Sequence, residues 1–501
     1  MMKKILGENS RVFRHPFIFT ALFCLLSAAL FDYSADGLTA YSKIIVFTAL
    51  AALIALGVRW KMNGELTPQR IAFLIIAGSF LVKLIYVLCT GLGERQHDVG
   101  AFKTTSAGHA GRILRASDGE ILQENMRGQS YHPPLHYILE GLWLKLLTLR
   151  GTEIDRAENY VTVLTLFYSC CVTLVGKKIF DELKMSDAAK NVALALVAFH
   201  PTFIILSASY NNDLLSILLL LVALLFALKW YNQPNVKNII PLALGIGCGM
   251  MSKLSAAYIA PAVAVLFILK LITEKEKRLK LIGQYAAFGA VCVPLGTWWS
   301  VYLYTVHDKP FGYVMKLSDK LDQYIGFRTV SERLFAISHS FSEGIWFARA
   351  DKGYTNSFFE YNIPSAILKT SVFGEWDIGK GNGFTEFLAY ALFFLNIAII
   401  AFSLYCMVML IIKKHPGVSA SLKTFLYILW TTIMGLFVKF CFDYPHNCTM
   451  DFRYIVPTVV TGAIFIGAYL DICKSKAVKY AVCAVTAAFC LAGSLLYVLA
   501  A

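Results

Sequence analysis

The sequence has little charge and none of the motifs of a soluble nucleotide-dependent enzyme. Asp, Glu, Lys and Arg together make up 16% of the 501 residues, whereas 57% are hydrophobic. There is no Walker or dinucleotide glycine pattern, no internal repeat, no low-complexity tract and no polar stretch long enough for a nucleotide-binding domain. A soluble domain of this length could not bury so much apolar surface. The composition and the missing motifs together therefore exclude a soluble nucleotide-dependent enzyme.

Spacing typical of metal sites or disulfide frameworks is also lacking. Most of the twelve cysteines lie inside hydrophobic segments, so we interpret them as small apolar packing residues. The glycines of LGIGCGMM (Gly245, Gly247 and Gly249) lie within an apolar run as well. They predict close packing of helices and not a phosphate-binding loop.

Long apolar runs are what the sequence does contain. Runs of about 18 or more apolar residues are typical of transmembrane helices. The chain is therefore predicted to be an all-α polytopic membrane protein of about thirteen transmembrane helices, near 16–33, 39–58, 70–92, 159–176, 188–207, 213–231, 238–254, 256–273, 281–304, 386–412, 422–442, 454–472 and 478–500.

The segment 134–149 is apolar but short, and it carries Glu140 and Lys145. Its pattern is amphipathic, which favours a juxtamembrane helix lying in the interface. With that helix outside, all the clusters of Lys and Arg fall on one side of the membrane, as the positive-inside rule requires. The N-terminus is then cytoplasmic, and the loops 93–158 and 305–385 face the non-cytoplasmic side of a plasma or inner membrane.

In a soluble protein, the net charge of +14 would suggest a nucleic-acid partner. In this chain the Lys and Arg residues gather in short loops between the predicted spans, where they set the orientation of the spans in the membrane. No nucleic-acid partner is therefore expected. The predicted division of the chain is a transmembrane hairpin with a cytoplasmic loop, a transmembrane core with an outer catalytic loop (93–158), a second outer loop, and C-terminal transmembrane helices, at 1–69, 70–304, 305–385 and 386–501.

Polar residues gather at the outer ends of the predicted helices. Ionisable groups near membrane depth are costly and commonly mark a substrate path. The candidates are Arg95, His97 and Asp98, the two histidines of SYHPPLH (His132 and His136), Asn212 and Asp213, Lys253, and Arg453 with Tyr454.

Simpler roles for several of these residues remain open. Asp213 could cap its helix with the help of Asn211 or Asn212, and Lys253 and Arg453 could extend toward lipid phosphates. His200–Pro201 indicates a kinked helix end.

Two or three cations with one or two acids would suit a phosphate that carries a sugar. Sugar transfer from a polyprenyl phosphate needs a carboxylate to accept the proton of the acceptor hydroxyl, and fixed cations to stabilise the departing phosphate. We assign the first role to Asp98 and the second to Arg453, Lys253 and His132. A single carboxylate acting as base implies inversion at the anomeric carbon.

The order of these features resembles the glycosyltransferase-C superfamily, in particular its family 39-like branch of protein O-mannosyltransferases and aminoarabinose transferases. The features are an outer-loop Asp after an early span, a PPL turn, KKIF at the end of the next span, HP followed by SASYNND, a Lys in MSKLS, a large outer loop, and FRYIVP before a late helix. The resemblance covers most of 70–472 and implies a GT-C type fold, a polyprenyl-phosphate sugar donor, and an acceptor that is a protein, a glycan or a lipid. It also implies that Asp98 is the base and that the residue before PPL contacts the donor phosphate.

This chain departs from the family pattern at two positions. His132 stands where the family has Lys before PPL, and Val99 stands where the mannosyltransferases commonly have a second acid. The first two spans resemble an addition before the family core.

Other functions stay open at this point. A transporter or flippase would also have many spans, but it usually shows internal repeats and polar groups near the midplane. A ligase of lipid-linked glycans would use the same kind of donor. The loop 305–385 is rich in aromatic residues and contains Glu375. Two roles are open for it, because it could cover the sugar or the acceptor, or its aromatic side chains could anchor it at the membrane interface. No cofactor is assigned, although His97, Asp98 and His109 could ligate a divalent cation.

Overall fold

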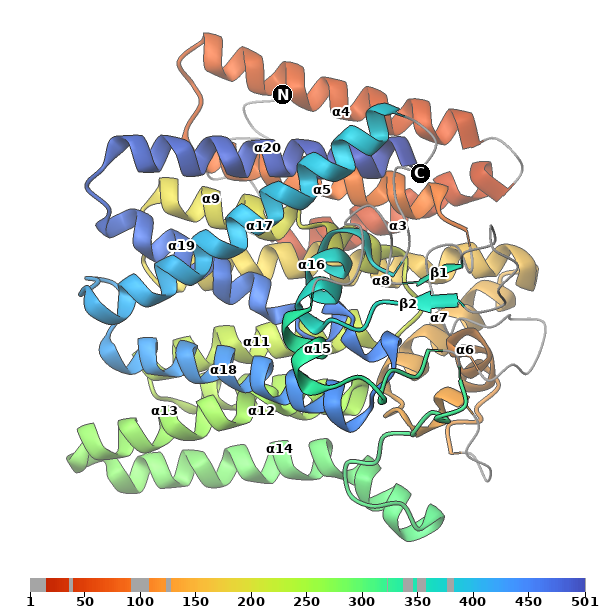
Figure 1. Ribbon diagram of the computed structural model, residues 1–501, viewed down its shortest axis with the longest axis vertical. Coiled ribbons are helices and arrows are strands. Elements are labelled where there is room, and N and C mark those ends of the chain that lie inside the picture. The colour runs from red at the N-terminus through yellow and green to blue at the C-terminus, as the bar shows by residue number, and fades with distance from the viewer. Residues whose placement is uncertain are drawn as a thin grey trace.

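Long helices run side by side in the structure, a computed structural model, and shorter elements gather at one end of the bundle (Figure 1). The structure describes residues 15–35, 39–91, 108–122, 128–321, 323–336, 346–348, 357–375 and 383–500.

The helices of the bundle are α3 (Pro16–Ala35), α4 (Thr39–Met62), α5 (Pro68–Cys89), α8 (Ile154–Glu182), α9 (Asp187–Ala198), α10 (Pro201–Ile205), α11 (Asp213–Asn232), α12 (Val236–Ser252), α13 (Ala260–Thr273), α14 (Arg278–His307), α17 (Gly383–Ile412), α18 (Ala420–Asp443), α19 (Pro457–Ile472) and α20 (Lys476–Ala500). The loops carry α6 (His109–Ser117), α7 (Leu135–Leu149), α15 (Val330–Phe335) and α16 (Ile363–Phe373). Short 3₁₀ turns are η1 (Gly128–Tyr131), η2 (Leu206–Ala208), η3 (Leu254–Ile259), η4 (Lys275–Lys277), η6 (Asn447–Met450) and η7 (Phe452–Tyr454).

The prediction of an all-α polytopic membrane protein is confirmed. Among the described residues, nine helices are long and apolar enough to cross a membrane, and α9 with α10 and η2 makes a tenth if they form one bent span. Three more predicted spans coincide with shorter apolar helices, at Pro16–Phe31, Val236–Ser252 and Pro457–Ile472, so the count of thirteen stays a prediction. In the part of the chain that the structure describes, one short antiparallel pair of strands departs from the helical fold, β1 (Trp346–Ala348) with β2 (Ser357–Phe359), and its backbone register pairs residue 346 with residue 359.

The predicted kink at His200–Pro201 is confirmed, because the axes of the two helix segments there differ by 51°. Pro201 has no N–H to continue α9 and instead begins α10. The Nδ1 atom of His200 accepts a hydrogen bond from the N–H of Thr202 (3.3 Å), so the imidazole serves as the helix cap.

Helix α7 packs on α6 at the end of the bundle that carries the strands (Figure 1). Its 15 residues span about 22 Å, less than the ~30 Å of a hydrocarbon core. The amphipathic pattern expected for α7 holds for Lys145, which is exposed, but not for Glu140, whose side chain is fully buried. Burial raises the pKa of Glu140 well above its usual value, which favours a proton on this carboxyl group.

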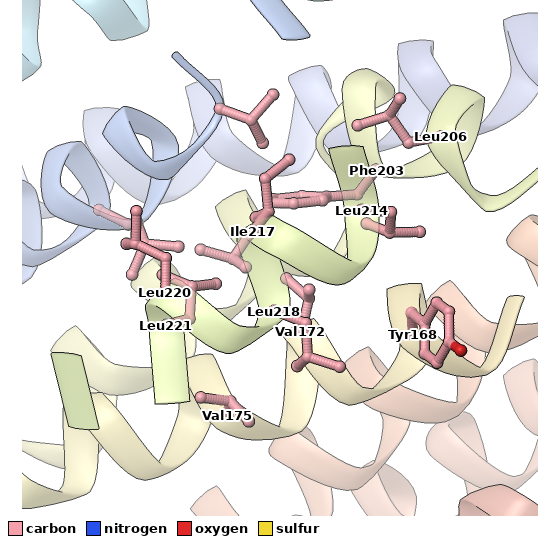
Figure 2. Packing of buried hydrophobic residues seen from close by; sticks show 14 of the residues in the cluster. Tyr168, Val172, Val175, Phe203, Leu206, Leu214, Ile217, Leu218, Leu220 and Leu221 are labelled. Carbon is pink, nitrogen blue, oxygen red and sulfur yellow. The ribbon is translucent and has the colours of Figure 1, made fainter. Parts of the chain in front are cut away.

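The core centres on α11, which is apolar on every face and packs against α8 and α12. Figure 2 shows Val172 and Val175 of α8 beside Leu218 and Leu221 of α11. The predicted close packing at the α12 glycines is confirmed. A Cβ atom at Gly245 would lie 2.9 Å from the backbone nitrogen of Ala223 in α11. This tight contact fixes how the ends of α11 and α12 meet, which is where the candidate site lies.

Candidate active site

Two reciprocal hydrogen bonds join the start of α11 to the end of α12. The side-chain amide of Asn212 donates to the carbonyl oxygen of Ser252 (2.5 Å), and the Ser252 hydroxyl donates to the carbonyl oxygen of Asn212 (3.1 Å). The next residues in each chain segment are Asp213 and Lys253, and their side chains form a direct ion pair. Asn212 is therefore a positioning residue, and the Asp213 side chain pairs with Lys253 and does not cap its helix.

The cap itself comes from Asn211. Its side-chain oxygen accepts a hydrogen bond from the backbone N–H of Asp213 (3.1 Å), as one of the simpler interpretations expected. The Asp213 carboxylate is thereby left to Lys253.

Arg453 lies in η7, where it meets three carboxylates from three parts of the chain. Its Nε atom lies 3.6 Å from Oδ2 of Asp451 and 4.0 Å from Oδ2 of Asp213. Its Nη2 atom lies 3.7 Å from Oε1 of Glu375, which directly follows α16. Asp451 also caps η7 by accepting the backbone N–H of Arg453 (2.8 Å). The guanidinium is thus held between α11, η7 and the second large loop.

Tyr454 packs beside both cations. Its ring centroid lies 4.6 Å from the ammonium nitrogen of Lys253 and 5.3 Å from Cζ of Arg453, which is the range of cation–π contacts. Burial raises the pKa of the Tyr454 hydroxyl well above its usual value, so it is a neutral donor. The predicted span at 454–472 begins too early, because α19 starts at Pro457, and its proline is suited to the first turn of a helix.

The charge balance differs from the expected two or three cations with one or two acids. Within the described ranges, Lys253 and Arg453 face three acids, Asp213, Asp451 and Glu375. Burial raises the pKa of Asp451, against the opposing effect of Arg453, which favours a proton on this carboxyl. Burial also lowers the pKa of Lys253, and Asp213 counteracts this. An incoming phosphate therefore has to draw the two cations away from carboxylates they already contact.

Histidines from the first large loop lie close to the same cations. The rings of His109 and His132 stack with centroids 6.0 Å apart, and Nδ1 of His109 lies 2.8 Å from the hydroxyl of Tyr137. Burial lowers the pKa of both histidines well below the usual value, and the charges of Lys253 and Arg453 act in the same direction. His132 is therefore neutral at pH 7, so it can hydrogen-bond a phosphate but adds no positive charge.

Arg112 is a further cation that the sequence argument missed. Its guanidinium carbon lies 4.2 Å from the ring centroid of Tyr137 and 5.6 Å from that of Trp299, and it donates to the carbonyl oxygen of Gln129. Burial lowers its pKa to about 10, so it stays charged. One sequence pattern could have pointed to Arg112. His109 and Arg112 are three residues apart in GHAGRI, a spacing that puts both side chains on one face of a helix.

His136 reaches the turn before α11 from α7. Its Nε2 atom lies 2.9 Å from the carbonyl oxygen of Tyr210, and because a carbonyl only accepts, Nε2 carries the proton. Burial lowers the pKa of His136 to about 4. The imidazole thus contacts backbone beside Asp213, and its role in substrate binding stays a prediction.

The remaining predicted site residues, Arg95, His97 and Asp98, lie outside the described residues, as do Trp376 and Asp377. Among the residues that are described, no group of three His, Cys, Asp or Glu side chains could hold a metal ion. Two members of the suggested His97, Asp98 and His109 set fall outside that range.

Cations and carboxylates gathered at one end of a helical membrane bundle commonly mark a substrate path. Residues 131–299 match the family model described as dolichyl-phosphate-mannose-protein mannosyltransferase. The match supports the glycosyltransferase-C, family 39-like assignment and, with it, a membrane glycosyltransferase that uses lipid-linked sugar donors. The matched segment includes His132, Asp213 and Lys253, whereas Arg453 lies beyond it. No curated protein matches the chain.

Proposed function

We propose that the chain transfers a sugar from a polyprenyl phosphate to an acceptor hydroxyl on the non-cytoplasmic face of a plasma or inner membrane, with inversion at the anomeric carbon. The observation that carries the proposal is the meeting of Lys253 and Arg453, two hundred residues apart in sequence, at a carboxylate that both contact, Asp213. Cations fixed in this way are suited to a leaving phosphate.

The reaction needs one proton acceptor and one site for the leaving group. Asp98 takes the proton of the acceptor hydroxyl while the acceptor oxygen forms its bond to the anomeric carbon. The bond from that carbon to the phosphate oxygen breaks, and the electron pair leaves with the polyprenyl phosphate. Lys253 and Arg453 stabilise the negative charge that develops there. The leaving phosphate is a weak base and needs no strong general acid.

Neutral groups around the cations add hydrogen bonds in this scheme. The uncharged His132 and the Tyr454 hydroxyl donate to phosphate oxygens without raising the positive charge of the site. Asp451, whose pKa is raised, shares a proton with the bound phosphate and so reduces repulsion between the two acids. A lipid carrier is the expected donor because nucleotide sugars are confined to the cytosol.

The test uses membranes that contain the protein, supplied with radiolabelled polyprenyl-phosphate mannose and, in parallel, other polyprenyl-phosphate sugars. Label should move from lipid to a non-lipid or second lipid acceptor with the wild type. The Asp98→Asn and Lys253→Ala variants, matched for abundance, should lose at least a hundredfold of that transfer. Lys474→Ala, which removes an exposed lysine from the far end of the bundle, is the control and should leave it unchanged.

Each outcome separates one candidate function from another. No transfer of any sugar by the wild type, together with movement of the labelled lipid between leaflets in a flipping assay, would establish a flippase. Normal transfer by Asp98→Asn would keep the enzyme and remove Asp98 as its base. Attachment of whole lipid-linked glycans would indicate a ligase.

A further inference from the structure

An apolar groove lies between α3, α5 and α8, at the end of the bundle away from the candidate active site. Its volume is ≈ 650 Å³. Aromatic and aliphatic side chains line it, including Phe19, Phe23, Phe73, Phe80 and Leu174. The groove exists because α3 packs mainly on α8 and only in part on α5.

The groove has the depth of one membrane leaflet. Along α5 its lining runs from Gln69 in the first turn to Leu81, which is about 18 Å at 1.5 Å per residue. Half of the hydrocarbon core of a bilayer is about 15 Å thick. A space of this kind next to hydrocarbon is suited to an acyl chain, because its apolar lining offers water few hydrogen-bond partners.

Lysines stand at the mouth of the groove, at the end of α8. Asp181 is shared between Lys177 (2.7 Å) and Lys190 (3.3 Å). Lys178 makes no salt bridge to any described residue, and its ammonium nitrogen lies 5.6 Å from the ring centroid of Phe17. Asp181 is the acid nearest to Lys178, and it is already paired with Lys177 and Lys190. Lys178 is therefore an exposed cation at the end of a predicted transmembrane helix, where it can attract a lipid phosphate.

We propose that this groove binds one anionic phospholipid, with an acyl chain against α5 and the headgroup phosphate on Lys178. The sugar donor is a poor candidate for the same place, because its phosphate must reach Lys253 and Arg453 at the opposite ends of the helices. The bound lipid ties α3 to α5 and α8, so it stabilises the N-terminal hairpin against the rest of the bundle. This site does not depend on the sugar-transfer reaction.

The test measures lipid retention by the purified full chain in mild detergent, by mass spectrometry of the intact protein–lipid complex. Phosphatidylglycerol and phosphatidylcholine with the same acyl chains are added back separately after delipidation. We expect the wild type to retain phosphatidylglycerol at least fivefold more than phosphatidylcholine. Lys178→Glu should abolish that preference, and Lys474→Glu, an exposed lysine between α19 and α20, should preserve it.

A second variant tests the apolar part of the groove. Ala77→Phe fills the lining of the groove from α5 and should reduce retention of both lipids at least fivefold. Gel filtration and the midpoint of thermal unfolding show whether it is folded, and Lys178→Glu, a surface change, tests the proposal without disturbing the packing. Equal retention of the two lipids by the wild type, or a preference that survives Lys178→Glu, would overturn the proposal. Recovery of a second protein or another copy of the chain from the groove would also overturn it.

Discussion

Lys253 and Asp213 form an ion pair that joins the last turn of α12 to the first residue of α11. Their side chains are 13% and 5% exposed, so neither charge is well solvated. Removing one partner leaves the other charge buried among Arg453, Asp451 and Glu375. The pair therefore contributes to folding and holds the Lys253 ammonium at the position where we propose that the phosphate binds.

Replacing Lys253 by Met should lower the free energy of unfolding by about 3 kcal/mol, because it leaves Asp213 with Arg453 alone. The double variant Lys253→Met with Asp213→Asn should recover most of this stability, since it removes both charges. Sugar transfer should fall at least a hundredfold in both variants, because the leaving phosphate loses a cation. Unfolding in mixed detergent and radiolabel transfer provide the two readouts. A double variant that recovers activity together with stability would show that Lys253 is only structural.

The sequence predicted the helices and the kink at Pro201, and it brought forward several residues that the structure places together in the candidate site. Apolar run length is a local property, and so are a proline after histidine and glycines at alternate positions of one helix, which face α11 at Gly245 and α14 at Gly247. Asp213, Lys253, Arg453 and Tyr454 could be chosen because they are polar residues at helix ends next to apolar spans, where their presence is costly.

The contacts between loops could not be predicted in this way. Nothing local in the sequence shows that Glu375 meets Arg453 or that Arg112 stacks on Tyr137, because each pair joins segments that approach only after the bundle has formed. The sequence could not predict that the Glu140 side chain points into the protein either. A helix of mixed polarity can turn a carboxyl group inward when burial raises the pKa of that group. Which carboxylates pair with Lys253 and Arg453 depends on long-range contacts of the same kind.

His136 makes the stability of the protein depend on pH. Its pKa is lowered from 6.5 to about 4, so between these values the unfolded chain binds a proton that the folded chain does not. Stability should therefore fall as the pH drops from 6.5 to 4, by about 3 kcal/mol for this residue, and be fully present above pH 6.5. His136→Gln, whose amide can still donate to the Tyr210 carbonyl, should flatten part of that dependence.

The measurement is the midpoint of detergent-induced unfolding at pH values from 7.5 to 4.5. His109 and His132 add to the slope in the same direction, so the comparison of wild type with His136→Gln isolates one residue. His307→Gln, a partly exposed histidine near the tyrosine Tyr302, is the control and should follow the wild type. Parallel curves for wild type and His136→Gln would contradict the assignment.

The buried ion pair between Lys369 and Glu360 fixes the second large loop. The two groups are 3.0 Å apart, with side chains 1% and 0% exposed, and the neighbouring Thr370 hydroxyl accepts the backbone N–H of Phe452 (2.9 Å). Lys369→Met should destabilise the protein by about 3–5 kcal/mol, because it removes the cation paired with the buried Glu360 carboxylate, which also accepts the backbone N–H groups of Tyr361 and Asn362. It should also reduce transfer, since Phe452 precedes Arg453.

The exposed pair of Lys439 and Asp443 is the matched control for this prediction. Its groups are 2.5 Å apart, but its side chains are 65% and 47% exposed. Lys439→Met should therefore change the free energy of unfolding by less than about 1 kcal/mol and leave transfer unchanged. Equal effects of the two lysine variants would show that burial does not decide the strength of these pairs.

Gly245 is the residue on which the approach of α12 to α11 depends. A Cβ atom there would lie 2.9 Å from the backbone nitrogen of Ala223 and 3.0 Å from the carbonyl oxygen of Leu219, and backbone atoms cannot turn aside as a side chain can. Gly245→Ala should destabilise the bundle by about 1–3 kcal/mol and lower transfer, because α12 has to move and Lys253 moves with it. Gly283→Ala in α14, where nothing lies within 4 Å of the new Cβ, should be neutral or raise stability by up to about 1 kcal/mol. If both substitutions proved neutral in unfolding and in transfer, the helices would have room to separate without loss of the site, and the position of Lys253 would have to be set by the hydrogen bonds of Asn212 alone.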